Sequence, residues 1–182
     1  MTSKTETSII EAGFAVFAAK PTATLADVAE AAGVGRATLH RHFKGREDLM
    51  IALAHRAMEE LDAAVEAATK NATSYTEGLR LALEAMIPLA ERQMFLEKEP
   101  LDNVPSIAEA RKRDAFELAE AVDKAKAEGG FAQDVPTPWI VQAYENLLFA
   151  AWIMVRDGEA THRQAATLAW RTLQSGVSGG TA

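Results

Sequence analysis

The residues from Thr24 to Phe43, TLADVAEAAGVGRATLHRHF, have the pattern of two short helices joined by a tight turn. Thr24 is a favourable N-cap, and Asp27 stands three residues later, where an acidic side chain completes a capping box. Gly33 can adopt the left-handed conformation that closes a helix, with Val34 as an apolar plug behind it. A second helix is expected over residues 35–42. Two helices joined by a glycine turn, the second rich in base-type side chains, predict a helix-turn-helix.

An αα-corner that binds no nucleic acid could share this pattern, so the charge distribution matters. The whole chain carries a net charge of -7, yet residues 34–46 contain four Lys and Arg, two His and no acidic residue. A short basic window can arise by chance. A basic patch on an acidic protein is nevertheless typical of a sequence-specific DNA-binding protein that must not adhere to every phosphate.

The second helix supplies the candidate base-reading side chains. Arginine can pair bidentately with guanine, and a threonine methyl can contact the thymine methyl. The residues expected to face the DNA groove are Arg36, Ala37, Thr38, His40 and Arg41. Contacts with DNA phosphates fix the position of a protein on the duplex without reading its base sequence. The residues expected to make them are Thr24, His42, Lys44 and Arg46. A shared metal ion at His40 and His42 is excluded, because side chains two apart on a helix diverge by about 200°.

The flanking residues extend the motif to three helices and a connector. Ile10, Phe14 and Phe17 form an apolar stripe on a preceding helix, expected over about residues 7–19, and a long connector helix is expected over about residues 46–69. Residues 8–53 resemble the amino-terminal DNA-binding domain of the TetR family of bacterial regulators. This resemblance implies a dimer, a small-molecule inducer and repression of transcription. It also implies that Arg46, which matches a basic residue of the family, contacts the DNA backbone.

Composition indicates an all-α protein of two parts. The 182 residues are 48% hydrophobic and lack the alternation typical of strands. We expect a helix-turn-helix DNA-binding domain over residues 1–46 and a helical ligand-binding and dimerisation domain over residues 47–182. The chain has no cysteine, which fits a reducing cytoplasm. Its longest apolar run in the final helices, residues 147–155, is too short to cross a bilayer, which needs about 20 residues.

The second part has helical segments interrupted by a proline. Ser74 is expected to cap a helix that breaks at Pro88, and Ser106 to begin a helix that ends near Glu128. A broken helix inside a helical body opens space, so apolar side chains near it are pocket candidates, although such residues are more often core. The candidate ligand-binding residues are Met86, Met94, Phe95, Phe116, Asn146, Phe149 and Trp152. Asn146 is included because a buried amide needs a partner; it could equally pair with its copy across a dimer.

Two very apolar helices close the chain, one starting at Thr137 and one at Thr161. A pair with this much apolar surface is expected to form a four-helix bundle with a second copy. The alternative is that the pair is buried within one chain. The candidate interface residues are Leu147, Ala151, Leu168 and Leu173.

These features together predict a cytoplasmic, homodimeric transcriptional regulator. Its partners would be a near-palindromic double-stranded DNA operator and an unknown small-molecule effector, with no membrane, cofactor or metal. The alternative is a helical carrier or enzyme that does not bind DNA. Against catalysis, three of the four histidines, at positions 40, 42 and 55, fall in or near the basic segment.

Overall fold

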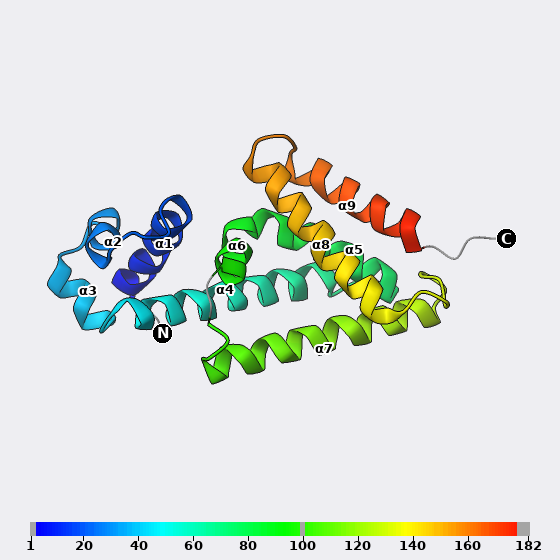
Figure 1. Cartoon of the computed structure of the whole chain (residues 1–182), viewed down its shortest axis with the longest axis horizontal. Coiled ribbons are helices and arrows are strands. Elements are labelled where there is room, and N and C mark those ends of the chain that lie inside the picture. The colour runs from blue at the N-terminus through cyan, green and yellow to red at the C-terminus, as the bar shows by residue number, and fades with distance from the viewer. Residues whose placement is uncertain (1–2, 99–100, 178–182) are drawn as a thin grey trace. The chain divides into compact units, whose positions relative to one another are not determined.

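The computed structural model describes residues 3–98 and 101–177, in which all regular structure is helical (Figure 1). The predicted all-α class is therefore confirmed. The chain forms two compact units: unit 1 comprises Met1–Glu60 and Glu91–Ala108, and unit 2 comprises Leu61–Ala90 and Glu109–Ala182. None of the helices in the described ranges has the length and apolar character needed to span a membrane.

Unit 1 begins with α1 (Lys4–Ala19), which starts three residues before the predicted boundary. The reason is a cap that the prediction overlooked: the Ser3 hydroxyl accepts a hydrogen bond from the Glu6 amide at 3.1 Å. The expected apolar stripe of α1 is buried, with Phe14 2% and Phe17 4% exposed.

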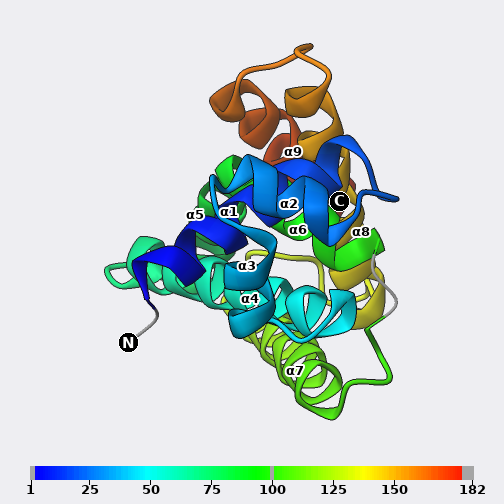
Figure 2. The ribbon, with the colours of Figure 1, turned by 90° about the vertical axis from the view of Figure 1, so that its left-hand side faces the viewer.

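The helix-turn-helix forms as the sequence predicts. Helix α2 (Leu25–Ala31) starts with a complete capping box between Thr24 and Asp27. Gly33 has φ +66°, and the Val34 amide donates to the Ala29 carbonyl at 2.9 Å, which is the Schellman closure. Helix α3 (Arg36–His42) follows at once and buries Leu39 against the rest of the unit. Figure 2 shows α1, α2 and α3 beside the first turns of the next helix.

The long connector α4 (Arg46–Thr69) has the predicted bounds. Helix α5 (Tyr75–Met86) is capped by Ser74, as expected, and Pro88 then breaks the helical path into a 3₁₀ turn, η1 (Ile87–Leu89). Helix α6 (Ala90–Lys98) resumes after it. Helix α7 (Pro105–Ala127) starts one residue before the predicted Ser106, at a proline, which is favoured in a first turn.

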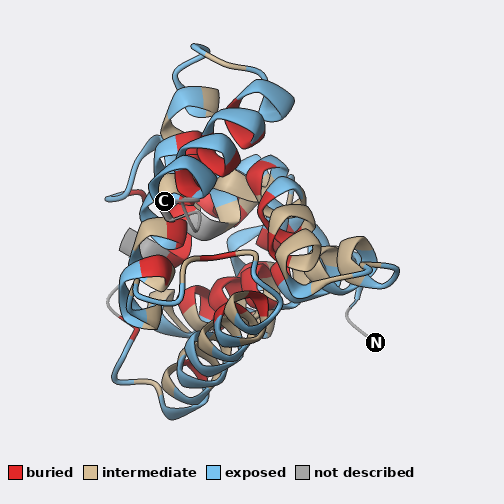
Figure 3. Cartoon of the chain, turned by 90° about the vertical axis from the view of Figure 1, so that its right-hand side faces the viewer, coloured by how far each residue is buried: buried red, intermediate tan, exposed pale blue. Residues whose placement is uncertain are grey.

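Unit 2 is built on α8 (Thr137–Arg156) and α9 (His162–Val177), which pack side by side. Figure 3 shows buried residues gathered where these two helices face their neighbours. Two polar groups enter this core with partners: the Tyr144 hydroxyl donates to the Leu79 carbonyl at 2.9 Å, and Trp152 Nε1 donates to the Met86 carbonyl at 3.3 Å. Burial raises the pKa of Tyr144 far above its usual value, so its hydroxyl stays a donor.

Candidate DNA-binding interface

Helix α3 presents a basic surface to solvent. Arg36, Ala37, His40 and Arg41 are all exposed, whereas Leu39 on the opposite side is 1% exposed and anchors the helix. The Schellman turn at Gly33 fixes the direction in which α3 leaves α2, and so it fixes which side chains point outward. These four residues are therefore free to contact a partner molecule, which base reading requires.

Thr38 and Arg41 lie together on this surface. Thr38 is half-buried, and its Oγ1 accepts a hydrogen bond from Arg41 Nη2 at 3.1 Å. Residues three apart on a helix are neighbours, so this contact holds the guanidinium along α3. The contact partly pre-orients one of the two arginines expected to read bases.

Two of the predicted phosphate-contacting residues are exposed at the edges of the motif. Lys44 follows α3 with its side chain exposed. Thr24 is exposed too, but its amide and hydroxyl both donate to Asp27 Oδ2, at 2.7 and 3.0 Å. These two hydrogen bonds lower the pKa of Asp27 below its usual value, and the one from the Thr24 amide has the larger effect. The Thr24 hydroxyl therefore already serves the capping box.

The other two phosphate candidates turn toward unit 1 itself. His42 is half-buried, with Nδ1 4.0 Å from Glu6 Oε2 of α1. Arg46 donates from Nη2 to the Pro21 carbonyl at 2.7 Å and from Nη1 to the Ala23 carbonyl.

Arg46 thus has a structural role that the sequence prediction missed. Its guanidinium lies over the Phe17 ring, 4.4 Å from the centroid, as well as bonding the two carbonyls of the loop between α1 and α2. It fastens the start of α4 to that loop. The partners are more than 20 residues away in sequence, so no local pattern around Arg46 could have identified them.

The predicted ligand-binding residues are not brought together as one set. Met94 and Phe95 belong to unit 1, where both are buried, and the other five belong to unit 2. Within unit 2, Trp152 is in the core and bonds the Met86 carbonyl, while Phe149 is 40% exposed.

Two of these predictions need correction. Phe116, expected to line a pocket, is 69% exposed on α7. Asn146, expected as a buried amide, is exposed, and its Nδ2 donates to the Gln142 carbonyl at 2.7 Å one turn earlier on α8. The helical spacing was read correctly in both cases, but the neighbours that cover each face were not predictable from it.

Unit 2 has a shallow depression at the start of α5. Its lining is mainly polar and includes none of the predicted ligand-binding residues; the residues around it are Thr73, Ser74, Thr76, Glu77, Arg80, Trp170 and Gln174. Within the described residues, no group of three or more His, Cys, Asp or Glu side chains is arranged to hold a metal ion.

The four residues predicted to lie at a dimer interface differ in how far they are buried within the single chain. Ala151 and Leu173 are 4% and 2% exposed and lie in the core of unit 2, so their assignment to a contact surface is corrected. Leu147 is half-buried, and Leu168 is 42% exposed. The structure also exposes large apolar side chains on α8 that the prediction did not name, Trp139 at 67% and Met154 at 38%.

Comparison with known proteins identifies relatives along the whole chain. Residues 9–53 match the family model described as bacterial regulatory proteins, tetR family. The HTH-type transcriptional repressor LfrR of Mycolicibacterium smegmatis is 30% identical over 175 residues, which cover 96% of this chain and 90% of LfrR.

Solved structures give the same result. The crystal structure of LfrR from Mycobacterium smegmatis in complex with proflavine matches with a TM-score of 0.80 and 29% identity, covering 97% of each chain. The ketosteroid transcriptional regulator KstR2 of Mycobacterium tuberculosis matches with a TM-score of 0.83 and 18% identity, covering 99% of this chain and 97% of KstR2. At that identity the second match concerns the fold alone.

Proposed function

Because this chain belongs to the tetR family of bacterial regulatory proteins and is a transcriptional repressor of that type, we propose that it binds a near-palindromic operator as a homodimer and leaves it when a small molecule binds. Each copy would place α3 in a major groove, with the two half-sites about one helical turn apart or a multiple of it. We place the protein in the cytoplasm with its operator. Members of this family are regulators rather than enzymes, which disfavours the enzyme alternative.

The exposed basic surface of α3 is the observation that carries this proposal. Arg36 and Arg41 both have the exposure that a bidentate contact with guanine needs, and His40 and Ala37 lie on the same short helix. Lys44 adds a positive charge beside it for a phosphate. Thr24, His42 and Arg46 are the weaker candidates, since their polar atoms have partners within unit 1.

DNA binding can be tested with the segment upstream of the protein's own coding sequence. A regulator should form a specific complex whose affinity falls steeply with salt, and replacing both Arg36 and Arg41 by Ala should abolish the specific complex. The matched control replaces two arginines of unit 2 by Ala, Arg80 and Arg156, each in an ion pair with an acidic residue, and so it removes the same number of positive charges. An unchanged complex in the double variant would contradict the assignment of α3.

The homodimer is supported by the apolar side chains left exposed on α8 and α9. Trp139, Phe149 and Leu168 have 67%, 40% and 42% of their surface exposed. Exposed apolar residues gathered on a helix pair are typical of protein–protein contacts. Leu168→Glu should therefore yield monomers in sedimentation analysis and weaken operator binding, while Arg163→Glu on the same helix changes charge without removing apolar surface.

The effector is proposed to be a small molecule bound by unit 2. Proflavine, which the LfrR crystal structure contains, is the first probe to titrate. To lower operator occupancy about a hundredfold, an effector must prefer the released conformation by roughly 2.7 kcal/mol. Met86 and Trp152, which are in contact in unit 2, are the predicted pocket residues to substitute first. Binding of proflavine with no change in operator affinity would rule it out as an effector.

A further inference from the structure

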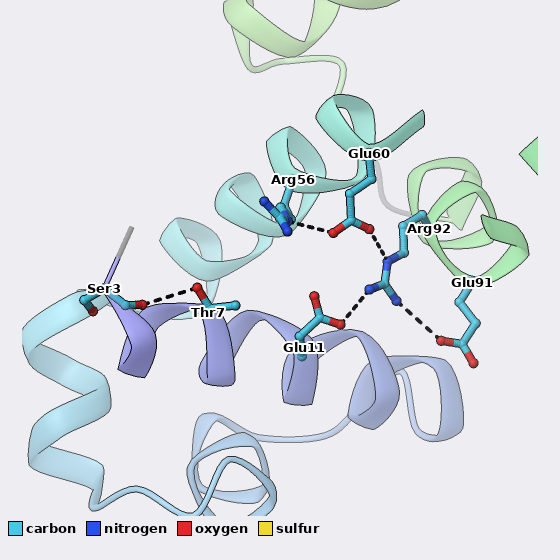
Figure 4. A network of polar contacts seen from close by, with 7 residues as sticks. All are labelled: Ser3, Thr7, Glu11, Arg56, Glu60, Glu91 and Arg92. Carbon is cyan, nitrogen blue, oxygen red and sulfur yellow. Dashed lines mark hydrogen bonds and ion pairs between the residues drawn. The ribbon is translucent and has the colours of Figure 1, made fainter. Parts of the chain in front are cut away.

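Four charged residues join three helices within unit 1, and we call them the Arg92 cluster: Glu11, Arg56, Glu60 and Arg92. Arg92 of α6 donates from Nη2 to Glu11 Oε2 of α1 at 2.6 Å and from Nε to Glu60 Oε2 of α4 at 2.8 Å. Arg56, one turn before Glu60, donates to Glu60 Oε1 at 2.7 Å. Figure 4 shows the Arg92 guanidinium lying between the two carboxylates.

The cluster rests on an aromatic contact. The Arg92 guanidinium lies over the Phe14 ring of α1, 4.3 Å from its centroid. Phe95, one turn further along α6, packs edge-on against the same ring, and the centroids of the two rings are 5.5 Å apart. Two side chains one turn apart on α6 therefore contact α1, one through its charge and one through an edge-to-face aromatic contact.

Burial makes the Arg92 contacts specific. The Arg92 side chain is 15% exposed, against 20% for Glu60 and 45% for Glu11. Burial opposes its charge, but hydrogen bonds to Glu60 and Glu11 outweigh this and raise the pKa of Arg92 above its usual value. A fork of donors aimed at two carboxylates from different helices is a geometry that arginine can supply and lysine cannot.

The position of Arg92 along the chain gives these contacts a consequence. The chain passes from unit 2 to unit 1 between Ala90 and Glu91, directly after the 3₁₀ turn η1, and passes back between Ala108 and Glu109. Arg92 thus fastens the returning segment one residue after its entry. Near its exit, Ser106 Oγ lies 3.1 Å from His55 Nε2 of α4.

We propose that Arg92 is a positioning residue for operator binding, which holds α1 through Glu11 and so passes a displacement of the chain after η1 to the helix-turn-helix. This inference rests on the proposed function, since it concerns how operator binding is controlled. It assigns the coupling to one guanidinium and one carboxylate. Loss of either should loosen α1, on which α2 packs, and weaken the operator complex.

The test compares operator binding by three variants of the full chain at one salt concentration. Arg92→Gln and Glu11→Gln should each weaken operator binding about tenfold, within the usual range of coupling between sites. The double variant should lose little more than either single variant, because both remove the same contact. Arg56→Gln is the matched control: it removes the same charge beside the same Glu60, but its ion pair lies within α4, and it should stay within about twofold of the unmodified protein.

Hydrogen exchange supplies a readout that loss of stability alone would not change. In the unmodified protein, operator DNA should slow amide exchange in both α3 and α6. In Arg92→Gln, held at a temperature where it is folded, protection of α3 should persist and protection of α6 should be lost. Glu11→Gln, at the most exposed member of the Arg92 cluster, keeps the test possible if Arg92→Gln folds poorly.

The outcomes separate the two proposals. If the unmodified protein binds no specific DNA, the proposed function fails. If it binds, but Arg92→Gln and Glu11→Gln bind equally well, or their effects multiply independently, the role of Arg92 is wrong. Protection of α6 by operator DNA that persists in Arg92→Gln would also overturn it.

Discussion

The two units of this molecule are stabilised in different ways. Unit 2 encloses a core of large side chains such as Trp152, Tyr144 and Leu173, and the few polar groups inside it bond to backbone carbonyls. Unit 1 carries two helices of seven residues each, and arginines fasten its parts. Helices this short are not stable alone, so their placement depends on the side chains that they bury, Val28 and Leu39 among them, and in α2 on its capping box as well. Unit 1 thus adds polar contacts between its elements to an apolar core, whereas unit 2 depends mainly on packing.

The largest effect is expected in the core of unit 2. Leu173→Ala removes a side chain that is 2% exposed and should cost about 3 kcal/mol, as buried leucines do. Urea unfolding followed by tryptophan fluorescence measures it, since all three tryptophans lie in unit 2. Leu168→Ala on the same helix, at 42% exposure, is the control and should cost under about 1 kcal/mol in the monomer. Equal losses would mean that the two leucines do not differ in packing.

The second effect tests fastening by arginine in unit 1. Arg46→Gln removes hydrogen bonds to Pro21 and Ala23 and the contact with Phe17, and should destabilise unit 1 by about 2 kcal/mol. Faster amide exchange in α1 and α2, with α9 unchanged, is the expected readout. Arg36→Gln removes the same charge from an exposed position, and it should leave these rates as they are. Acceleration by both would point to net charge rather than to the loop contacts.

A third, smaller effect concerns the turn of the helix-turn-helix. Gly33 has φ +66°, and no described atom lies within 4 Å of where its Cβ would be, so Gly33→Ala introduces backbone strain without a clash. The expected cost is about 1 kcal/mol, measured by thermal unfolding, with weaker operator binding. Gly33→Asn should lose less, because asparagine tolerates the left-handed region. An alanine variant as stable as the parent would mean that the turn relaxes to another closure.

The smallest effect depends on pH. Hydrogen bonds from Thr24 lower the pKa of Asp27 in the folded chain, so the ionised carboxylate stabilises the fold. That contribution is fully present above the unfolded pKa of about 4 and is lost as pH falls through the lowered folded value. The melting temperature of Asp27→Asn should therefore lie below that of the parent at pH 7, and the gap should narrow toward pH 3. A gap independent of pH would exclude the charge as its source.

Local signals in the sequence were sufficient for the parts of the fold that local chemistry decides. The capping box at Thr24, the closure at Gly33, the bounds of α4 and the break at Pro88 all depend on residues within one or two turns of each other. The exposed residues of α3 follow from the same local pattern, since Leu39 identifies the buried side.

What the sequence could not provide depends on partners far along the chain. Glu11 and Arg92 are 81 residues apart, and neither stands in a pattern that indicates the other. Leu168 and Leu173 were both expected at an interface for a related reason: both suit an apolar helix, and only the packing of unit 2 decides that Leu173 is covered while Leu168 is exposed. Phe116 shows the converse, a residue at core spacing whose side of α7 is open.

Helix α1 is held at two successive turns by cations from two other helices. Arg46 at the start of α4 covers Phe17, and Arg92 of α6 covers Phe14. Rotation of α1 about its own axis would therefore uncover one of these two rings. In the proposed homodimer, a signal would then adjust the spacing between the two copies of α3 rather than the shape of either copy.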